Sequence, residues 1–161
     1  MTYLKFVISI FIVLAASRFV PHPPNFTSLI ALSFYVPAFF GVKFLVVVLM
    51  SFILTDIFIG FHQIIIFTWG SVILIGLISK YFSYTITKRL VGVFFGAIIF
   101  FVVTNFGVWA LGSYGYSVEG LIKCYVMAIP FFVYTLISTL VFSSIIEGIN
   151  VFFRIEKLKN K

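Results

Sequence analysis

The sequence of 161 residues has almost no cysteine and very few acidic side chains. Its single cysteine, Cys124, excludes the disulfide framework that stabilises many small secreted domains. Only four residues are Asp or Glu, and charged residues make up 9% of the chain, against about 25% in a typical soluble domain. These side chains are too few to cover a soluble surface, so the composition excludes a soluble enzyme and a disordered chain.

Several motifs that carry chemistry are also missing. The sequence has no glycine-rich phosphate loop, no His-Glu-x-x-His and no Cys-x-x-Cys. The chain is therefore not expected to hydrolyse ATP by itself, and the sequence predicts no metal, no cofactor and no enzymatic activity. An intramembrane enzyme that uses Asp56 with His22 or His62 is the least favoured alternative, because no recognised catalytic spacing connects these residues.

Apolar residues take the place of the missing polar ones. Hydrophobic residues make up 63% of the chain and aromatic residues 20%, including 23 Phe. The apolar runs are long enough to cross a membrane, for which a helix needs about 20 residues. We therefore predict an all-α integral membrane protein with six transmembrane helices in one compact domain, residues 1–161. The predicted spans are residues 5–20, 27–41, 44–61, 64–79, 90–111 and 119–146.

The distribution of basic residues predicts the orientation. Of the eleven Lys and Arg residues, only Arg18 and Lys123 fall on one side of the six-span arrangement, and the other nine fall on the opposite side. Cytoplasmic segments of membrane proteins carry an excess of Lys and Arg. Both termini, including the basic tail at 154–161, are therefore predicted in the cytoplasm of a bacterium whose cytoplasmic (inner) membrane the chain spans. The net charge of +7 then reflects topology, and no nucleic-acid partner is expected.

With this orientation, the unusual polar residues collect near the outer membrane face. They come from the ends of several predicted helices and from the loops beside them, an arrangement that favours a ligand pocket open to the exterior. A carboxylate inside an apolar helix is costly and usually faces a cavity or a partner. The candidate ligand-binding residues are Arg18, His22, Asn25, Asp56, His62, Asn105, Trp109 and Tyr125.

Each candidate also has a structural interpretation. Asp56 is equally consistent with a structural ion pair to Arg18. Trp109 and the two histidines fit an aromatic or polar belt at the level of the lipid headgroups. Asn105 fits a hydrogen bond between helices, and Asn25, after two prolines, fits a helix cap.

Four stretches of the sequence resemble a known family in the same order along the chain. The matching blocks are Arg18–Thr27, with its Pro-His-Pro-Pro-Asn core, and Asp56–His62, Thr104–Trp109 and Cys124–Phe132. They resemble a family of small, uncharacterised bacterial membrane proteins that is related to the substrate-binding S components of energy-coupling-factor (ECF) vitamin transporters.

This resemblance implies six helices, cytoplasmic termini and an outer pocket for a vitamin or a metal ion. It also implies partners, namely a transmembrane scaffold and ATPase subunits on separate chains. Ala15 and Ala16 are adjacent, so the Ala-x-x-x-Ala motif with which many S components dock the scaffold is missing. The chain starts Met1-Thr2, whereas nickel and cobalt members start Met-His. We therefore expect uptake of a small vitamin-like nutrient, with a structural or accessory subunit of a larger membrane complex as the alternative.

Overall fold

The computed structural model describes residues 3–153, and this part of the chain is all-α, as predicted. It contains six α-helices and two short 3₁₀ helices, and no strand among the described residues. The predicted basic tail at 154–161 lies outside the described residues. The helices are α1 (Tyr3–Phe19), α2 (Leu29–Phe40), α3 (Leu45–Ile59), α4 (Ile65–Ile78), α5 (Ile86–Ala110) and α6 (Val118–Phe153), with η1 (Val42–Phe44) before α3 and η2 (Ser79–Tyr81) after α4.

Glycine and threonine set several helix ends. Gly41 and Gly60 follow α2 and α3 with φ angles of 98° and 104°, and only glycine adopts this conformation without strain. Thr85 caps α5, because its side-chain oxygen accepts a hydrogen bond of 3.2 Å from the backbone N–H of Lys88. This cap starts α5 four residues before the predicted position 90, and it brings Arg89 into the helix.

The short helix α2 lies at the centre of the bundle. Eleven of its twelve residues are buried, and it contacts each of the other five α-helices. An α-helix that is apolar on every side is typical of a protein core. At about 1.5 Å per residue, α2 is about 18 Å long, which is shorter than the roughly 30 Å of a bilayer's hydrocarbon core. α2 is therefore buried within the protein and is shorter than the hydrocarbon core, and the predicted span at residues 27–41 stays a prediction.

Three helices are long and apolar enough to cross a membrane. The first consists of η1 together with α3 (Val42–Ile59). The second is α5, and the third is most of α6. The surface is apolar as well, and Phe58 and Ile66 are each at least 75% exposed. These properties are compatible with a membrane protein. The prediction of six spans goes beyond them and stays a prediction.

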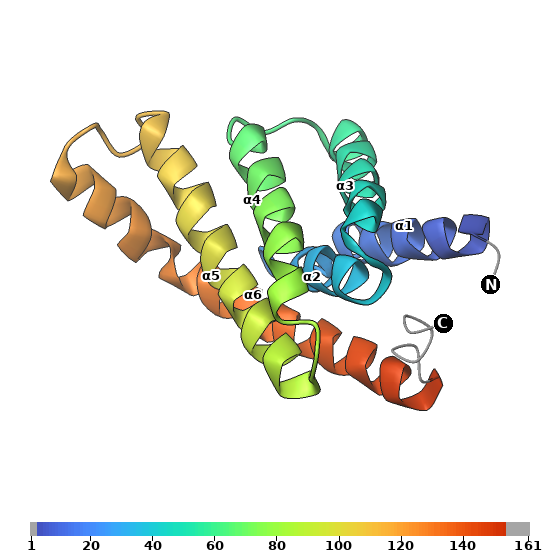
Figure 1. Cartoon of the computed structure of the whole chain (residues 1–161). Helices are drawn as coiled ribbons and strands as arrows, with labels where there is room; N and C mark the ends of the chain where they lie inside the picture. Colours follow the sequence, from blue (N-terminus) through green and yellow to red (C-terminus); the bar gives the residue numbers. More distant parts are fainter. Residues whose placement is uncertain (1–2, 154–161) are drawn as a thin grey trace.

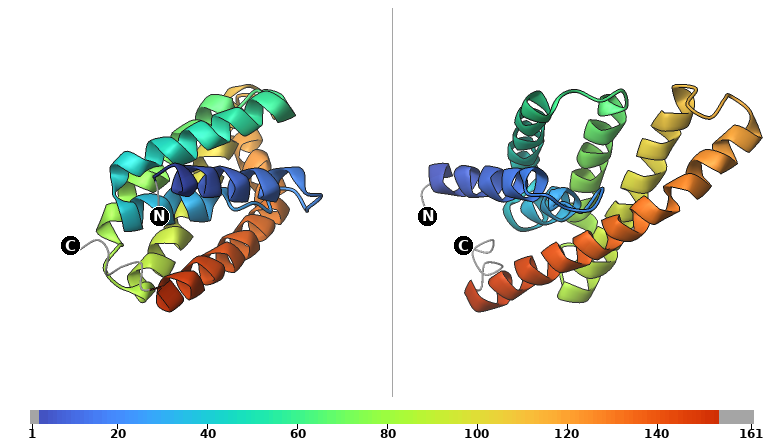
Figure 2. Two further views of the ribbon diagram at one scale, coloured as in Figure 1. Left: turned by 90° about the vertical axis from the view of Figure 1, so that its right-hand side faces the viewer. Right: turned by 180° about the vertical axis from the view of Figure 1, so that it is seen from behind.

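The helices do not all run in one direction. Figure 1 shows α3, α4 and α5 following one another across the molecule, while α1 lies crosswise beside α3. The 36-residue α6 packs along α5 and passes obliquely behind it, as the view from behind shows in Figure 2. In both figures, the first turn of α1 and the last turn of α6 lie on the same side of the molecule.

Small residues allow α5 to approach its neighbours closely. A Cβ atom added at Gly92 would lie 2.6 Å from the ring of Phe34, and one added at Gly96 would lie 3.1 Å from Ile75. The Gly92-x-x-x-Gly96 pattern therefore packs α5 against α2 and α4 within the chain, as expected for small residues at helix contacts.

Candidate functional site

A cavity of about 570 Å³ opens at one end of the bundle. It lies where α1, α3 and α5 end and where α2, α4 and α6 begin, and all six helices contribute residues to its wall. Ligand pockets in proteins commonly enclose about 300–1,000 Å³. The cavity is therefore large enough for a small organic molecule.

The wall combines aromatic rings with a few polar side chains. Five phenylalanines line it, two from α5, two from α6 and one from α3, and the rings of Phe101 and Phe132 are 4.5 Å apart. Such a wall suits a ligand with an apolar or aromatic body, whose orientation polar groups would fix. The polar side chains on the wall are Arg18, His22, Asn25, Thr27, His62, Thr68, Thr104, Asn105, Tyr114 and Thr135, with the thiol of Cys124 beside them.

The structure brings five of the eight predicted site residues onto this wall. They come from the end of α1, the α1–α2 loop, the α3–α4 loop and the last turns of α5. Their role in binding a ligand stays a prediction. The five residues are Arg18, His22, Asn25, His62 and Asn105.

The other three predicted residues lie off the wall. Asp56 is buried behind Arg18. The indole N–H of Trp109 donates to the backbone carbonyl of Ser117 at 3.2 Å, one turn beyond Asn105. The hydroxyl of Tyr125 donates to the carbonyl of Val102 at 2.8 Å. Trp109 and Asn105 were expected to line the pocket together, and the structure places only Asn105 there.

A buried network holds Arg18 at the edge of the cavity. Its Nη2 lies 2.6 Å from Oδ1 of Asp56, and its Nη1 donates to the hydroxyl of Thr55 and, at 3.3 Å, to the carbonyl of Phe52. The indole N–H of Trp69 donates to the second carboxylate oxygen, Oδ2 of Asp56, at 2.8 Å. The network joins α1, α3 and α4, so the structural interpretation of Asp56 as the partner of Arg18 agrees with the geometry.

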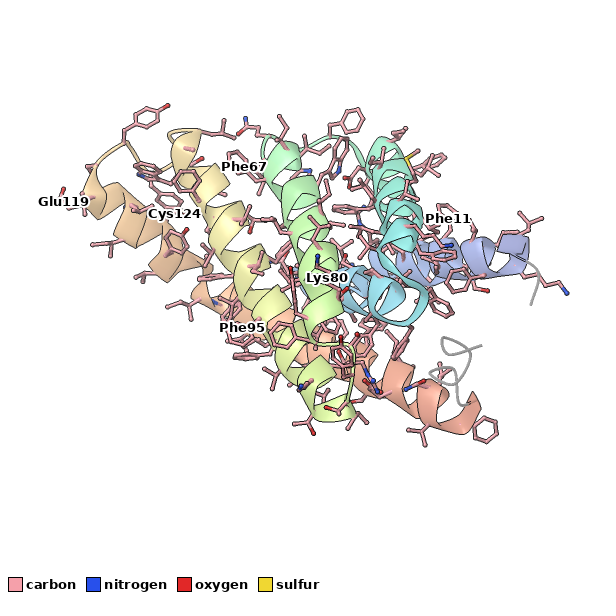
Figure 3. The ribbon with its side chains drawn as sticks, in the orientation of Figure 1. Phe11, Phe67, Lys80, Phe95, Glu119 and Cys124 are labelled. Carbon is pink, nitrogen blue, oxygen red and sulfur yellow. The ribbon has the colours of Figure 1, made fainter. Side chains whose placement is uncertain are left out.

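The α5–α6 contact forms the inner wall of the cavity. The thiol of Cys124 lies 3.3 Å from the backbone carbonyl of Asn105, and the side-chain amide of Asn105 donates to the carbonyl of Phe101 at 2.7 Å. In Figure 3, Cys124 lies on the side of α6 that faces α5, whereas Glu119 projects outward from the first turn of α6. Glu119, the only acidic side chain of this turn, is not among the residues that line the cavity.

A second buried ion pair, which was not predicted from the sequence, lies at the opposite end of α5. Arg89 in the first turn of α5 binds Glu147 of α6 through two hydrogen bonds of 2.6 and 2.9 Å, and Asn150 lies 3.4 Å from the same carboxylate. Arg89 is 2% exposed, although the sequence placed it in a cytoplasmic loop. The signal was available, because Glu147, like Asp56, is a rare carboxylate inside an apolar stretch.

Other wall residues gave no signal in the sequence. Thr68, Thr104 and Thr135 lie in apolar helices, where a hydroxyl commonly bonds the carbonyl three or four residues earlier, as all three do here. Within residues 3–153, no group of three His, Cys, Asp or Glu side chains is arranged to hold a metal ion.

The fold and the cavity define a helical protein of membrane-like composition with a ligand-sized cavity at one end of its bundle. The chain belongs to DUF6580, a family of unknown function, whose sequence profile matches residues 2–160. No curated protein and no solved structure matches the chain. The family description names no ECF transporter, so the resemblance to S components stays a prediction.

Proposed function

We propose that this protein is a membrane-embedded binding protein for the uptake of a small vitamin-like nutrient. The cavity of about 570 Å³ carries this proposal, because it combines aromatic walls with convergent polar side chains from α1, α4, α5, α6 and the loops between the helices. Pockets that bind small organic molecules have this composition. Arg18, Asn105 and the two histidines would orient the ligand, and the phenylalanines of α5 and α6 would contact its apolar part.

We place the six helices in the bacterial cytoplasmic membrane, with both termini on the cytoplasmic side. The basic residues support this orientation, since nine of eleven would face the cytoplasm. The apolar surface and the three long helices support the membrane location. In this orientation the cavity faces the exterior, where a nutrient arrives.

Uptake also needs an energy source or a gradient. The sequence has no phosphate loop, so any ATP hydrolysis would belong to separate chains. A transmembrane scaffold with ATPase subunits, as in the ECF transporters that the sequence resembles, is the partner that we propose.

Native mass spectrometry of the gently purified protein tests the proposal. A bound small molecule in one-to-one stoichiometry is the expected result. Thr104→Trp places a large ring on the wall and should abolish the extra mass that the bound molecule adds to the protein. Val91→Trp, on an exposed side of the same helix, is the matched control and should retain it. Identical ligand content in the two variants would show that the molecule is bound elsewhere.

An accessory subunit of a larger membrane complex is the second candidate function. The exposed side of α6 favours it, because only 22% of the helix's most apolar stretch is buried within this chain. A partner helix could cover that surface as well as lipid does. Co-purification of a stoichiometric protein partner, with no small molecule in the cavity, would support this function and contradict nutrient binding.

A further inference from the structure

The charges around the cavity are unevenly distributed. Arg18 and two histidines, His22 and His62, stand on the wall, and no Asp or Glu of residues 3–153 does. Asp56 is the nearest candidate, but it is 1% exposed, and each of its oxygens already accepts a hydrogen bond, from Arg18 and from Trp69. A ligand in the cavity would therefore meet hydrogen-bond donors and positive charge, and no carboxylate.

Arg18 keeps donors for a ligand although it is paired. A guanidinium group carries five N–H donors. The bonds to Phe52, Thr55 and Asp56 use both Nη1 hydrogens and one Nη2 hydrogen. The Nε hydrogen and the second Nη2 hydrogen have no hydrogen-bond partner among the described residues, and the side chain is 14% exposed at the cavity wall.

The pairing also fixes the position of these donors. Asp56 lies behind Arg18, and the ring of Phe52 lies 4.5 Å from the guanidinium carbon. An arginine whose geometry is already fixed loses little side-chain entropy when it binds a carboxylate or phosphate group. Charge-assisted hydrogen bonds of this kind are about twice as strong as bonds between neutral groups.

The rest of the wall is suited to an apolar body. Phe100 and Phe101 of α5 face the cavity together with Phe131 and Phe132 of α6. Aromatic rings pack favourably against one another in offset or edge-to-face arrangements. One region of the cavity thus offers cationic donors, and another offers flat apolar surfaces.

We infer that the cavity binds a small organic anion, with its carboxylate or phosphate group at Arg18 and its ring system against the phenylalanines of α5 and α6. This inference rests on the proposed function and names the chemical class of its ligand. It excludes cationic nutrients, because the wall offers them no counter-ion.

Three probes of one shape test the inference. They are 2-naphthoate, neutral 2-naphthamide and cationic 2-naphthylmethylammonium, measured by titration calorimetry on the protein in phosphatidylcholine nanodiscs, with empty nanodiscs as the blank. We expect 2-naphthoate to bind at least tenfold more tightly than 2-naphthamide, equal to about 1.4 kcal/mol, and the cation to bind most weakly. This ranking of affinities, measured on the unmodified protein, tests the preference for an anion without any variant.

Variants then locate the preference. Replacing both members of the pair, Arg18→Gln with Asp56→Asn, removes two opposite charges together and leaves amides that can still bond each other. We expect the preference for 2-naphthoate to fall below threefold while 2-naphthamide still binds. Lys123→Gln changes an exposed lysine away from the wall and should preserve the full preference.

The other outcomes separate the two proposals. If the amide or the cation binds as tightly as 2-naphthoate, and Thr104→Trp blocks this binding, the cavity is a binding site but the anion preference is refuted. If no probe binds at millimolar concentration, both the anion preference and the proposed function fail. If anionic phosphatidylglycerol in the nanodiscs displaces 2-naphthoate, the cavity holds a lipid headgroup, and the inference of a water-soluble ligand is overturned.

Discussion

Arg18 and Asp56 form one pair of side chains that connects helices and also reaches the proposed binding site. The carboxylate accepts hydrogen bonds from α1 and from α4, so it connects three helices, while the guanidinium group reaches the cavity wall. A buried pair adds little stability compared with apolar residues of the same volume, but removing one partner leaves a buried charge unpaired. Replacing either residue alone should therefore destabilise the protein more than replacing both together.

Asp56→Leu should lower the free energy of unfolding by about 3–5 kcal/mol, because it leaves Arg18 without a counter-ion. It also leaves the indole N–H of Trp69 unpaired. Unfolding of the detergent-solubilised protein, followed by circular dichroism against denaturant, measures the change. The double variant Arg18→Met with Asp56→Leu should recover most of the loss, and Glu119→Gln, at an exposed position, should change nothing. Full stability of Asp56→Leu alone would show that the carboxylate has no structural role.

In the second pair, both Arg89 and Glu147 are buried, so each depends on the other for its counter-ion. Glu147→Gln should destabilise the protein by about 3–5 kcal/mol, since Arg89 keeps its charge in an environment that excludes water. Lys88→Gln, one residue from Arg89 and exposed, is the matched control. The same unfolding experiment would refute a structural role for the pair if both variants unfolded alike.

At the scale of the helices, glycines in α5 allow neighbouring helices to approach it closely. Gly92→Ala should destabilise the protein by about 1–3 kcal/mol, because the new methyl group would overlap the ring of Phe34 and the side chain of Phe82. Gly70→Ala on α4 is the matched control, since a Cβ there meets no atom within 4 Å. This control should be neutral or stabilising by up to about 1 kcal/mol. Equal effects of the two substitutions would contradict close packing at Gly92.

The helices themselves were predictable, but their extents were less so. The predicted spans ended at residues 20, 41 and 61, each within two residues of the observed ends of α1, α2 and α3. The start of α5 depends on the Thr85 cap, which a hydropathy profile does not detect. The burial of α2 could not be predicted, because a core helix and a membrane span have the same apolar composition.

Some residues of the candidate site were predictable because polar side chains are rare in this apolar sequence. Arg18, His22 and Asn105 attracted attention for that reason, and all three lie on the cavity wall. Trp109 was predicted as a ligand-binding residue as well, but the sequence does not show where α5 passes the edge of the cavity, and only Asn105 lies on its wall. The phenylalanines of the wall are indistinguishable in sequence from the chain's other phenylalanines.

For the whole molecule, the proposed orientation in the membrane is the property to test first. Tyr84 and Tyr116 are both more than 70% exposed, in the loops at opposite ends of α5. In a Cys124→Ala background, Tyr116→Cys should react with a membrane-impermeant maleimide on spheroplasts, and Tyr84→Cys should react only after permeabilisation. Fluorescent labelling on a gel measures both. The reverse pattern would place the cavity on the cytoplasmic side and contradict uptake from the exterior.

The central position of α2 has a consequence for how the family tolerates sequence change. A helix in contact with all five others has almost no position at which a new side chain can be accommodated, yet it contributes only Leu29 and Ile30 to the cavity wall. In a saturation mutagenesis screen, the strongest intolerance should therefore fall on α2, where it reports folding. Under the proposed function, ligand specificity would diversify on the wall residues of α5 and α6, whose replacement leaves the centre of the bundle intact.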